Sequence, residues 1–370
     1  MNLLFISTTY LPTINGVSYY QHFLAQALRR LGHTVYLYAP RHPRAKPDPF
    51  VIRYPAVITP FVYDYPLSLP PFHLHLLDRL DLDLVHIHHP FTVGTCALKL
   101  KRTRGLPFIF THHTQYHQYL QTNFPLFPRL TAHLINRHLF TLAQAAHAVI
   151  CPTPSVQRQL QALGLTNTVQ LPNGINLAPF SPQTKPAPPP WRLIFIGRLE
   201  KEKQPHQLLA LAQNLRAHHF PFHLTLVGAG RLLPSLQQQI RELSLQSLVT
   251  CTGPLTYRHI ARLLPRQHLF VSFSTTEVMP LSYLEALACG VPLALVQTNC
   301  LPRFTAAAIG LALPQDPAAA ATYLIRLFHD PTRYRRLVKS TPTYASGFSL
   351  DHSAHQLLKL YREAVKSAVV

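Results

Sequence analysis

The alternation of strand and helix signals is the feature that most limits how this chain can fold. "LLFIS" (3–7) is a short apolar run typical of a buried strand. Residues 17–33 then place apolar side chains at helical spacing up to Gly32, and "TVYLYAP" (34–40) is again strand-like. A strand, a helix and a second strand in this order predict a crossover between two parallel strands.

The alternation continues through the chain and restarts once. "SPQTKPAPPP" (181–190) is proline-rich, polar and without periodicity, and it predicts a linker between two domains. We therefore predict an α/β protein with two doubly wound, parallel-sheet domains that face a cleft. The predicted domains are residues 1–180 and 191–350, with a C-terminal helix at 351–370 that packs back on the first domain.

The composition excludes several classes of protein. No run approaches 18 apolar residues, and "MNLLFIST" lacks the basic region of a signal peptide, so we expect a cytoplasmic protein without a spanning helix. Five cysteines without a C-x-x-C pair favour reduced thiols. The net charge of +20 favours a lipid surface or a phosphate-bearing substrate, with a general solubility bias as the alternative. We expect no nucleic-acid partner, because no stretch interleaves basic and aromatic residues on one face.

Three loops that follow predicted strands carry glycines or cations, at the edge where open parallel sheets bind ligands. Gly16 would let a ligand approach the N–H groups of the first helix, although an ordinary turn uses the same residue. Arg198 and Lys203 flank the start of a helix and favour a diphosphate site, with two solvated cations as the alternative. Gly228 and Gly230 lack the third glycine of a dinucleotide fingerprint and are also typical of a tight turn.

The fourth loop is "STTEVMPLSYLEALACGVP" (274–292), which holds two of the six glutamates of the chain. Pro280 suits a first helical turn. Three N–H groups around it are then free to bind an anion, those of Met279, Leu281 and Ser282. Glu285 would lie among apolar neighbours, where a carboxylate without a partner is costly. We interpret Glu277 and Glu285 as acceptors for sugar hydroxyls beside a phosphate site.

Two histidine clusters, "HIHHPF" (86–91) and "THHTQYHQY" (111–119), follow strands of the first half. Clustered histidines suggest a metal, but neither segment has a nearby carboxylate, and 23 histidines in the chain make clustering by composition plausible. We therefore predict no metal site and no resident cofactor.

In combination and in this order, the motifs resemble the retaining family-4 glycosyltransferases of the GT-B fold over nearly the whole chain. The motifs are "P-x-x-N-G-V" (12–17), "PNGIN" (172–176), G-R-L-x-x-E-K (197–203) and E-x7-E (277–285). "TYLPTINGVSYY", "HIHHPFTVG" and "THHTQYHQY" look most like the branch that holds diacylglycerol glucosyltransferases and phosphatidylinositol mannosyltransferases.

The resemblance implies a nucleotide-diphosphate sugar as donor and a membrane lipid such as diacylglycerol as acceptor. Arg198 and Lys203 would neutralise the diphosphate as the glycosidic bond breaks. Glu277 would bind a hydroxyl of the donor sugar, and His113 would line this sugar near its reacting carbon. The implied catalytic residues are therefore His113, Glu277, Arg198 and Lys203. The remaining donor-site residues would be Glu285 at the ribose, Leu255 at the nucleobase, and Gly16, Met279, Leu281 and Ser282 beside the phosphates.

Two departures from the family pattern leave other functions open. The family usually has glycine at Pro280, so one N–H donor is lost. An acidic residue common in the lipid branch is replaced at His117-Gln118. The alternatives are a nucleotide-sugar epimerase of the same fold and a degenerate protein that only binds a sugar nucleotide or a lipid.

Residues 53–77 are rich in aromatics and proline and lack strand or helix periodicity, so they predict an extended loop at the mouth of the cleft. The aromatic rings would suit a lipid headgroup boundary, with rings folded inward as the alternative. They belong to Tyr54, Phe61, Tyr63, Tyr65 and Phe72. With the positive charge, this segment favours peripheral association with the inner face of the cell membrane.

Overall fold

The computed structural model describes residues 1–370 except 59–65, 69–73, 92, 114–127, 299 and 370. Contacts divide the chain into two compact units. Unit 1 is Met1–Gly174 with Leu350–Val370, and unit 2 is Ile175–Ser349. The chain therefore passes between the units at two points, and the end of the chain returns to the unit that holds its beginning.

Unit 1 is built on a seven-stranded sheet with the order β3-β2-β1-β6-β7-β8-β9, in which every pair is parallel. The apolar run predicted as the first strand is an interior strand of this sheet, and its side chains are almost entirely buried. The strands are β1 (Asn2–Ile6), β2 (Thr34–Pro40), β3 (Val51–Tyr54), β6 (Leu84–Ile87), β7 (Phe108–Thr111), β8 (Ala148–Cys151) and β9 (Thr168–Gln170).

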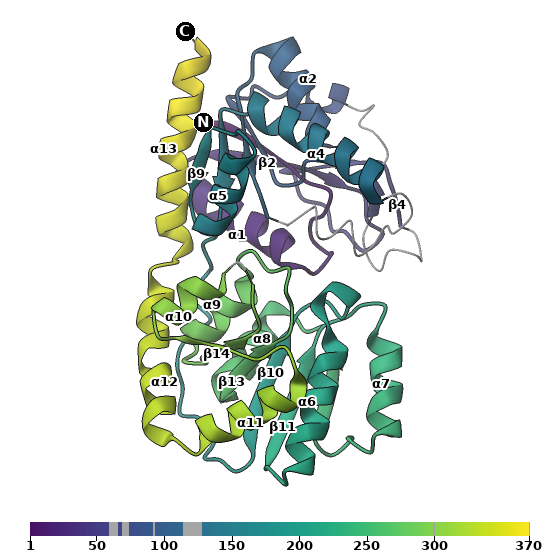
Figure 1. Ribbon diagram of the computed structural model, residues 1–370. Helices are drawn as coiled ribbons and strands as arrows, with labels where there is room; N and C mark the ends of the chain where they lie inside the picture. The colour runs from purple at the N-terminus through teal and green to yellow at the C-terminus, as the bar shows by residue number, and fades with distance from the viewer. Residues whose placement is uncertain (59–65, 69–73, 92, 114–127, 299, 370) are drawn as a thin grey trace. The chain divides into compact units, whose positions relative to one another are not determined.

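Helices cover the sheet of unit 1 (Figure 1). They are α1 (Gly16–Arg30), α2 (Gly94–Arg104), α4 (Pro128–Ala145), α5 (Pro154–Ala162) and α13 (Leu350–Val369). Asn15 caps α1 by accepting a hydrogen bond from the Ser18 N–H, and Gly32 follows the helix with a φ of +82°. The helix α13 contacts α1, β6 and β7, so this distant segment completes the core of unit 1.

Unit 2 has a six-stranded parallel sheet with the order β12-β11-β10-β13-β14-β15. The strands are β10 (Trp191–Ile196), β11 (Phe222–Val227), β12 (Val249–Gly253), β13 (Leu269–Ser272), β14 (Leu293–Leu295) and β15 (Gly310–Ala312). The helices are α6 (Pro205–Ala217), α7 (Leu233–Glu242), α8 (Tyr257–Leu263), α9 (Leu281–Ala288), α10 (Leu301–Ala306), α11 (Pro317–Phe328) and α12 (Pro331–Ser346). Two parallel-sheet α/β domains confirm the predicted fold class.

The proline-rich segment 181–190, predicted as the linker, lies inside unit 2. Lys185 donates from Nζ to the carbonyl oxygen of Gln267 at 2.6 Å and to that of Pro265 at 3.4 Å. Burial lowers the pKa of Lys185 to about 8. The composition of the segment indicates that it lacks regular structure, but it does not indicate whether the segment packs against a domain. The division between the two units lies at residue 174 instead.

The prediction of an irregular extended loop at 53–77 is wrong for the part that the structure describes. It contains the end of β3, the antiparallel pair β4 (Ala56–Ile58) and β5 (Pro66–Ser68), and the short helix η1 (Leu74–Leu77). Strands of three residues are too short to show a period. Tyr54 points inward, with 1% of its surface exposed, and donates to the Ser7 carbonyl oxygen at 2.8 Å.

The other four aromatic residues proposed for a headgroup boundary lie outside the described residues; they are Phe61, Tyr63, Tyr65 and Phe72. Among the described residues, no helix is both long and apolar enough to cross a bilayer.

Candidate active site

The loops that follow β10 and β11 in unit 2 are packed tightly against each other. The Leu199 N–H donates to the Ala229 carbonyl oxygen at 2.9 Å. A Cβ atom at Gly228 would collide with the carbonyl oxygen of Gly197, and one at Gly230 with that of Leu199. Gly228 also has a φ of +144°, which L side chains rarely adopt. The G-x-G motif therefore allows close contact between two loops, and that contact fixes the loop that carries Arg198.

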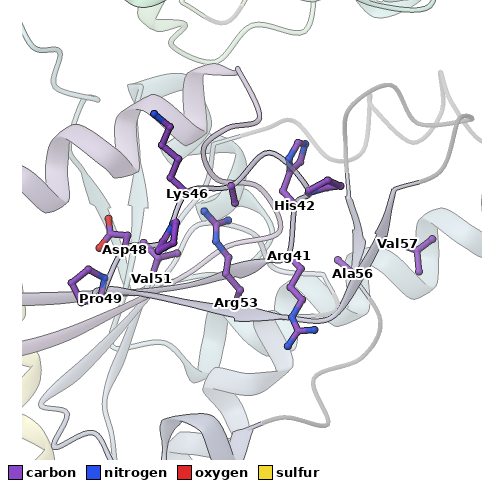
Figure 2. A pocket seen from close by; sticks show the side chains of 12 residues that line it. Arg41, His42, Lys46, Asp48, Pro49, Val51, Arg53, Ala56 and Val57 are labelled. Atoms are coloured by element: carbon purple, nitrogen blue, oxygen red, sulfur yellow. The ribbon is translucent and has the colours of Figure 1, made fainter.

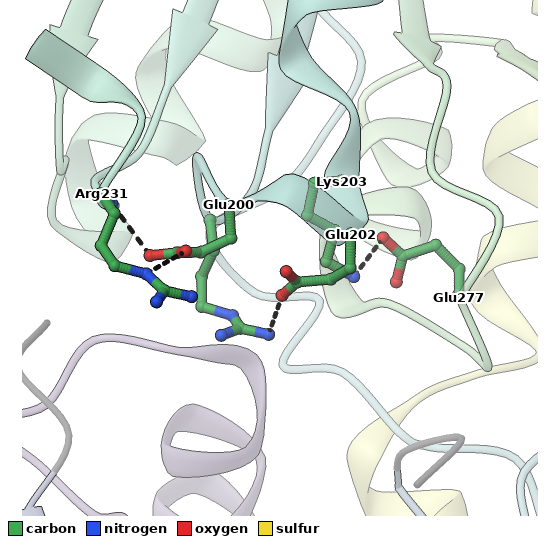
Figure 3. A network of polar contacts seen from close by, with 6 residues as sticks. Glu200, Glu202, Lys203, Arg231 and Glu277 are labelled. Carbon is green, nitrogen blue, oxygen red and sulfur yellow. Dashed lines mark hydrogen bonds and ion pairs between the residues drawn. The ribbon is translucent and has the colours of Figure 1, made fainter. Parts of the chain in front are cut away.

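The best-defined contact at this edge of unit 2 joins Lys203 to Glu277 (Figure 3). The Lys203 Nζ lies 2.6 Å from Glu277 Oε1, and the two side chains are only 15% and 13% exposed. Lys203 follows β10 and Glu277 follows β13, and these strands are neighbours in the sheet. Thr298 holds the backbone of Glu277 by donating from Oγ1 to its carbonyl oxygen at 3.0 Å. Two motif elements that lie far apart in the sequence therefore meet at one place.

Two further ion pairs lie in the same network (Figure 3). Arg198 Nη2 lies 2.6 Å from Glu202 Oε1, and the Glu202 side chain is only 3% exposed. The Arg231 N–H and Nε donate to the two carboxylate oxygens of Glu200, both at 2.9 Å. Sequence analysis identified none of the partners Glu202, Glu200 and Arg231. Glu202 had a usable signal, its spacing of four residues from Arg198, whereas nothing local connects Arg231 with Glu200.

The helix α9 begins at Leu281, so Pro280 is its N-cap, with φ −65° and ψ 138°, and does not belong to the first turn as predicted. Glu285 lies one turn further along and is only 5% exposed. Within the described part of the chain, no donor reaches its carboxyl group. Burial raises the pKa of Glu285 to about 8, so the group keeps its proton at neutral pH.

The remaining predicted donor-site residues of unit 2 lie on two loops that follow strands. Leu255 follows β12 and is half-buried. The side chains of Met279 and Leu281 are 3% and 9% exposed, so they pack inward. Ser282 is half-buried in the first turn of α9.

In unit 1, His113 follows β7 and forms a hydrogen bond to His88. The His113 Nε2 lies 3.0 Å from His88 Nδ1, and the two rings are stacked with an interplanar angle of 19°. The ring of Tyr20 on α1 meets His113 edge-on. Burial lowers the pKa of both histidines well below the ordinary value, so both rings are neutral.

The tautomers of this pair follow from the other ring nitrogen of His88. The Nε2 atom of His88 is buried and has no partner among the described residues. A buried N–H donor without a partner is rarer than an acceptor without one. We therefore place the His88 proton on Nδ1, from which it donates to His113 Nε2. His113 then carries its own proton on Nδ1 and can donate it to a ligand.

Two other histidines of the clusters bind hydroxyl groups. His86 Nδ1 lies 2.6 Å from the Tyr361 Oη of α13, and His86 Nε2 lies 2.7 Å from Thr111 Oγ1. His89 Nδ1 lies 3.0 Å from Ser7 Oγ. Burial lowers the pKa of His86 to about 3 and that of His89 to about 4. Across the described residues, no group of three or more histidine, cysteine or acidic side chains is arranged for a metal.

No local pattern indicates Tyr361 as a partner of His86, because the two residues lie 275 positions apart. Gly16 is the first residue of α1 and is exposed, as a residue that a ligand approaches needs to be. The rest of the second histidine segment, including His117-Gln118, lies outside the described residues.

A pocket of about 1150 Å³ lies at the ends of β2 and β3 in unit 1 (Figure 2). It is lined by residues 41–43, 45–49, 51, 53, 56 and 57. Sequence analysis did not single out residues 41–51, and residues 53, 56 and 57 belong to the segment 53–77 that it proposed for a membrane surface.

Residues 14–179 match the family described as Glycosyltransferase Family 4, and residues 179–343 match Glycosyl transferases group 1. The chain belongs to the family-4 glycosyltransferases. This confirms the predicted family and the predicted activity, that of a hexosyltransferase.

The chain is similar to two curated glycolipid enzymes. It is 27% identical over 318 residues to the alpha-monoglucosyldiacylglycerol synthase of Acholeplasma laidlawii, covering 79% of each chain. It is 28% identical over 197 residues to a GDP-mannose-dependent alpha-(1-6)-phosphatidylinositol dimannoside mannosyltransferase of Mycobacterium tuberculosis, covering 51% of each.

Two solved structures share the fold of this glycosyltransferase. The sucrose-phosphate synthase of Thermosynechococcus elongatus has a TM-score of 0.82 at 21% identity, with 99% of each chain covered. Anabaena HepE, solved with UDP-glucose, has a TM-score of 0.75 at 18% identity, with 99% of this chain and 100% of HepE covered. At such low identity the likeness shows the fold alone, which is GT-B.

Proposed function

We propose that this enzyme is a retaining hexosyltransferase that uses a nucleotide-diphosphate sugar and a lipid acceptor such as diacylglycerol at a membrane surface. The relatives support the acceptor, because their names include diacylglycerol and phosphatidylinositol. HepE, which was solved with UDP-glucose, supports the donor class. The donor would bind to unit 2 and the acceptor to unit 1.

The contact between Lys203 and Glu277 is the observation that carries the proposal. A sugar diphosphate presents two kinds of group side by side, charged phosphate oxygens and neutral hydroxyls. The Lys203 Nζ and Glu277 Oε1 atoms lie 2.6 Å apart and provide a partner for each kind of group, with Lys203 at the phosphate and Glu277 at a sugar hydroxyl. Arg198, on the same loop as Lys203, would add a second positive charge. Both cations would stabilise the negative charge that develops on the departing diphosphate.

The proposed transfer has a simple balance of bonds and protons. An acceptor hydroxyl forms a bond to the anomeric carbon, and the bond from this carbon to the diphosphate oxygen breaks. The departing diphosphate keeps the electron pair and takes the hydroxyl proton. Neutral His113 is a poor base because its pKa is lowered by burial. Its proposed role is to donate from Nδ1–H to the donor sugar.

Glu285 has a separate proposed role at the ribose. Its protonated carboxyl group can both donate and accept a hydrogen bond, which suits the two neighbouring hydroxyls of a ribose. The N–H groups at the start of α9 would face the phosphates. Because Arg198 and Lys203 already supply two positive charges at the diphosphate, we propose that transfer needs no metal ion.

The test is a transfer assay with radiolabelled UDP-glucose or GDP-mannose and vesicles that contain diacylglycerol. We expect a glycolipid with the anomeric configuration of the donor, determined by NMR, and the same rate in EDTA. Binding of a nucleoside diphosphate without transfer would favour a degenerate binding protein. The observation that favours this alternative is Pro280, which lacks an N–H donor at the start of α9. Appearance of a second free sugar nucleotide without acceptor would favour an epimerase.

A further inference from the structure

The pocket at the ends of β2 and β3 has no role in the transfer derived above. Its walls are the segment that follows the carboxyl end of β2, two residues of β3, and the start of β4, and the carboxyl ends of parallel strands are where such sheets bind ligands. Residues 41–57 carry four arginine or lysine side chains and one aspartate. This charge makes an anion the natural occupant of the pocket.

Arg53 provides a cation with a fixed position. Its Nη1 donates to the Pro40 carbonyl oxygen at 2.9 Å, and its Nη2 donates to the Leu11 carbonyl oxygen at 2.7 Å. The guanidinium also lies over the ring of Tyr10, 5.5 Å from the ring centroid. These neutral groups orient Arg53 without balancing its charge. Among the described residues, no carboxylate forms an ion pair with it.

Lys46 provides a second cation on the same side. Figure 2 shows the side chains of Lys46, His42 and Arg53 pointing to one side of the strands, whereas Arg41 points the other way. Lys46 is exposed and forms no ion pair within the described part of the chain. A fixed guanidinium and a flexible ammonium are a common pair of ligands for a phosphate group.

The apolar side of the pocket indicates where the phosphate comes from. Ala56 and Val57 on β4 line it, and 53% of the Val57 surface is exposed. A soluble phosphate gains nothing from an exposed valine. A lipid headgroup at a bilayer surface offers both a phosphate and an apolar boundary for such a side chain.

We propose that this pocket binds the phosphate of an anionic phospholipid headgroup, with Arg53 as the fixed ligand and Lys46 as the flexible one. The inference deepens the proposed function, because it gives unit 1 a defined contact with the membrane that holds the acceptor. Its test measures binding alone and therefore does not depend on transfer.

The experiment compares the unmodified protein with three variants. Lys46→Glu reverses the flexible cation, and Asp48→Asn removes the acidic side chain of the lining while keeping the oxygen that accepts from the Phe50 N–H at 2.9 Å. Lys99→Glu is the matched control, because Lys99 is exposed on α2 outside the pocket. Each protein is sedimented with vesicles of phosphatidylglycerol and phosphatidylcholine, or of phosphatidylcholine alone, and titrated with glycerol phosphate.

We expect Lys46→Glu to weaken binding to the anionic vesicles about tenfold or more, Asp48→Asn to strengthen it, and Lys99→Glu to change it much less. Glycerol phosphate alone should bind weakly to every variant. Equal losses in Lys46→Glu and Lys99→Glu would overturn the proposal, because they would indicate general charge attraction. Tight, Lys46-dependent binding of glycerol phosphate without vesicle binding would overturn the lipid as the source of the phosphate.

Nucleoside diphosphate affinity separates this inference from the proposed function. The donor residues proposed above all lie in unit 2 except His113 and Gly16. The two pocket variants and the Lys99→Glu control should therefore keep their affinity for UDP or GDP. Lost vesicle binding with unchanged nucleotide affinity would support the pocket whether or not transfer is observed.

Discussion

The two units make their site residues ready for a ligand in opposite ways. In unit 2 the site residues form ion pairs, as Lys203 does with Glu277 and Arg198 with Glu202. In unit 1 the stacked pair His88 and His113 is neutral, because burial lowers the pKa of both rings and no carboxylate pairs with either ring among the described residues.

This difference corresponds to what each unit is proposed to bind. A diphosphate gains charge as it leaves, and cations that are already positioned stabilise that charge without reorganisation. A neutral sugar hydroxyl needs an oriented N–H or a lone pair, and a full charge beside it would only retain water. If the charged residues of unit 2 and the neutral histidines of unit 1 were exchanged, each site would therefore suit its proposed ligand poorly.

Removing the paired cation of unit 2 should have the largest effect. Lys203→Ala should lower kcat/KM by about 10²–10³-fold, because the diphosphate loses a charge and Glu277 is left half-buried without its partner. Initial rates over a range of donor concentrations measure this. Lys201→Ala is the matched control, since Lys201 is exposed two residues away. Similar losses in both variants would show that only the total charge matters.

Glu285 lies in unit 2 but is neutral like His88 and His113 of unit 1, because burial keeps its carboxyl group protonated. The folded protein holds its proton up to a pH of about 8, whereas the unfolded chain releases it near the ordinary 4.5. The unfolded state therefore binds fewer protons in this window, and stability falls as the pH rises through it. Glu285→Gln should remove this fall and stabilise the ligand-free protein by about 2–3 kcal/mol at pH 9.

Urea unfolding at pH 5, 7 and 9 measures the effect for both proteins. Glu242→Gln, at the exposed end of α7, is the matched control and should leave the pH dependence unchanged. Parallel pH curves for Glu285→Gln and the unmodified protein would show that Glu285 is already ionised in the folded state.

The hydrogen bond between the two histidines of unit 1 should have a smaller effect. His88→Phe keeps the stacked ring but removes the donor to His113, and it should lower kcat about tenfold with little change in the donor KM. His88→Asn places an amide donor near the same position and should restore part of the rate. Because both rings are neutral, histidine protonation should not lower kcat between pH 8 and pH 6. An equal loss in both variants would indicate that His88 acts only in packing.

The smallest expected effect concerns the start of α9. Pro280→Gly adds one N–H donor beside the proposed phosphates and should tighten nucleoside diphosphate binding about threefold. Calorimetric titration with UDP and GDP measures this. Pro317→Gly makes the same change at the start of α11 in the same unit and should leave affinity unaltered. Unchanged or weaker binding in Pro280→Gly would place the phosphates away from this helix.

Local patterns in the sequence were sufficient to predict most elements but not the partners of the site residues. Apolar runs predicted β1 and β2, and helical spacing predicted α1, because each signal lies within a few turns or one strand.

The contacts missed were those set by the arrangement of the sheets. Tyr361 reaches His86 only because α13 returns to unit 1, and Arg231 meets Glu200 only because β10 and β11 are neighbours. The predicted linker failed for the same reason, since Lys185 finds its acceptors about 80 residues away. The roles of Arg198, Lys203, Glu277 and His113 stay predictions that the variants above test.

The return of α13 to unit 1 affects the order in which the chain can mature on the ribosome. Strands β1 to β9 are synthesised first, yet the hydroxyl that binds His86 arrives only after the whole of unit 2 has been translated. Until then the nascent unit 1 exposes the faces of α1, β6 and β7 that α13 later covers. Unit 2, whose strands and helices are continuous in sequence, can finish folding before the unit that precedes it. The first domain to leave the ribosome is therefore the last to be completed.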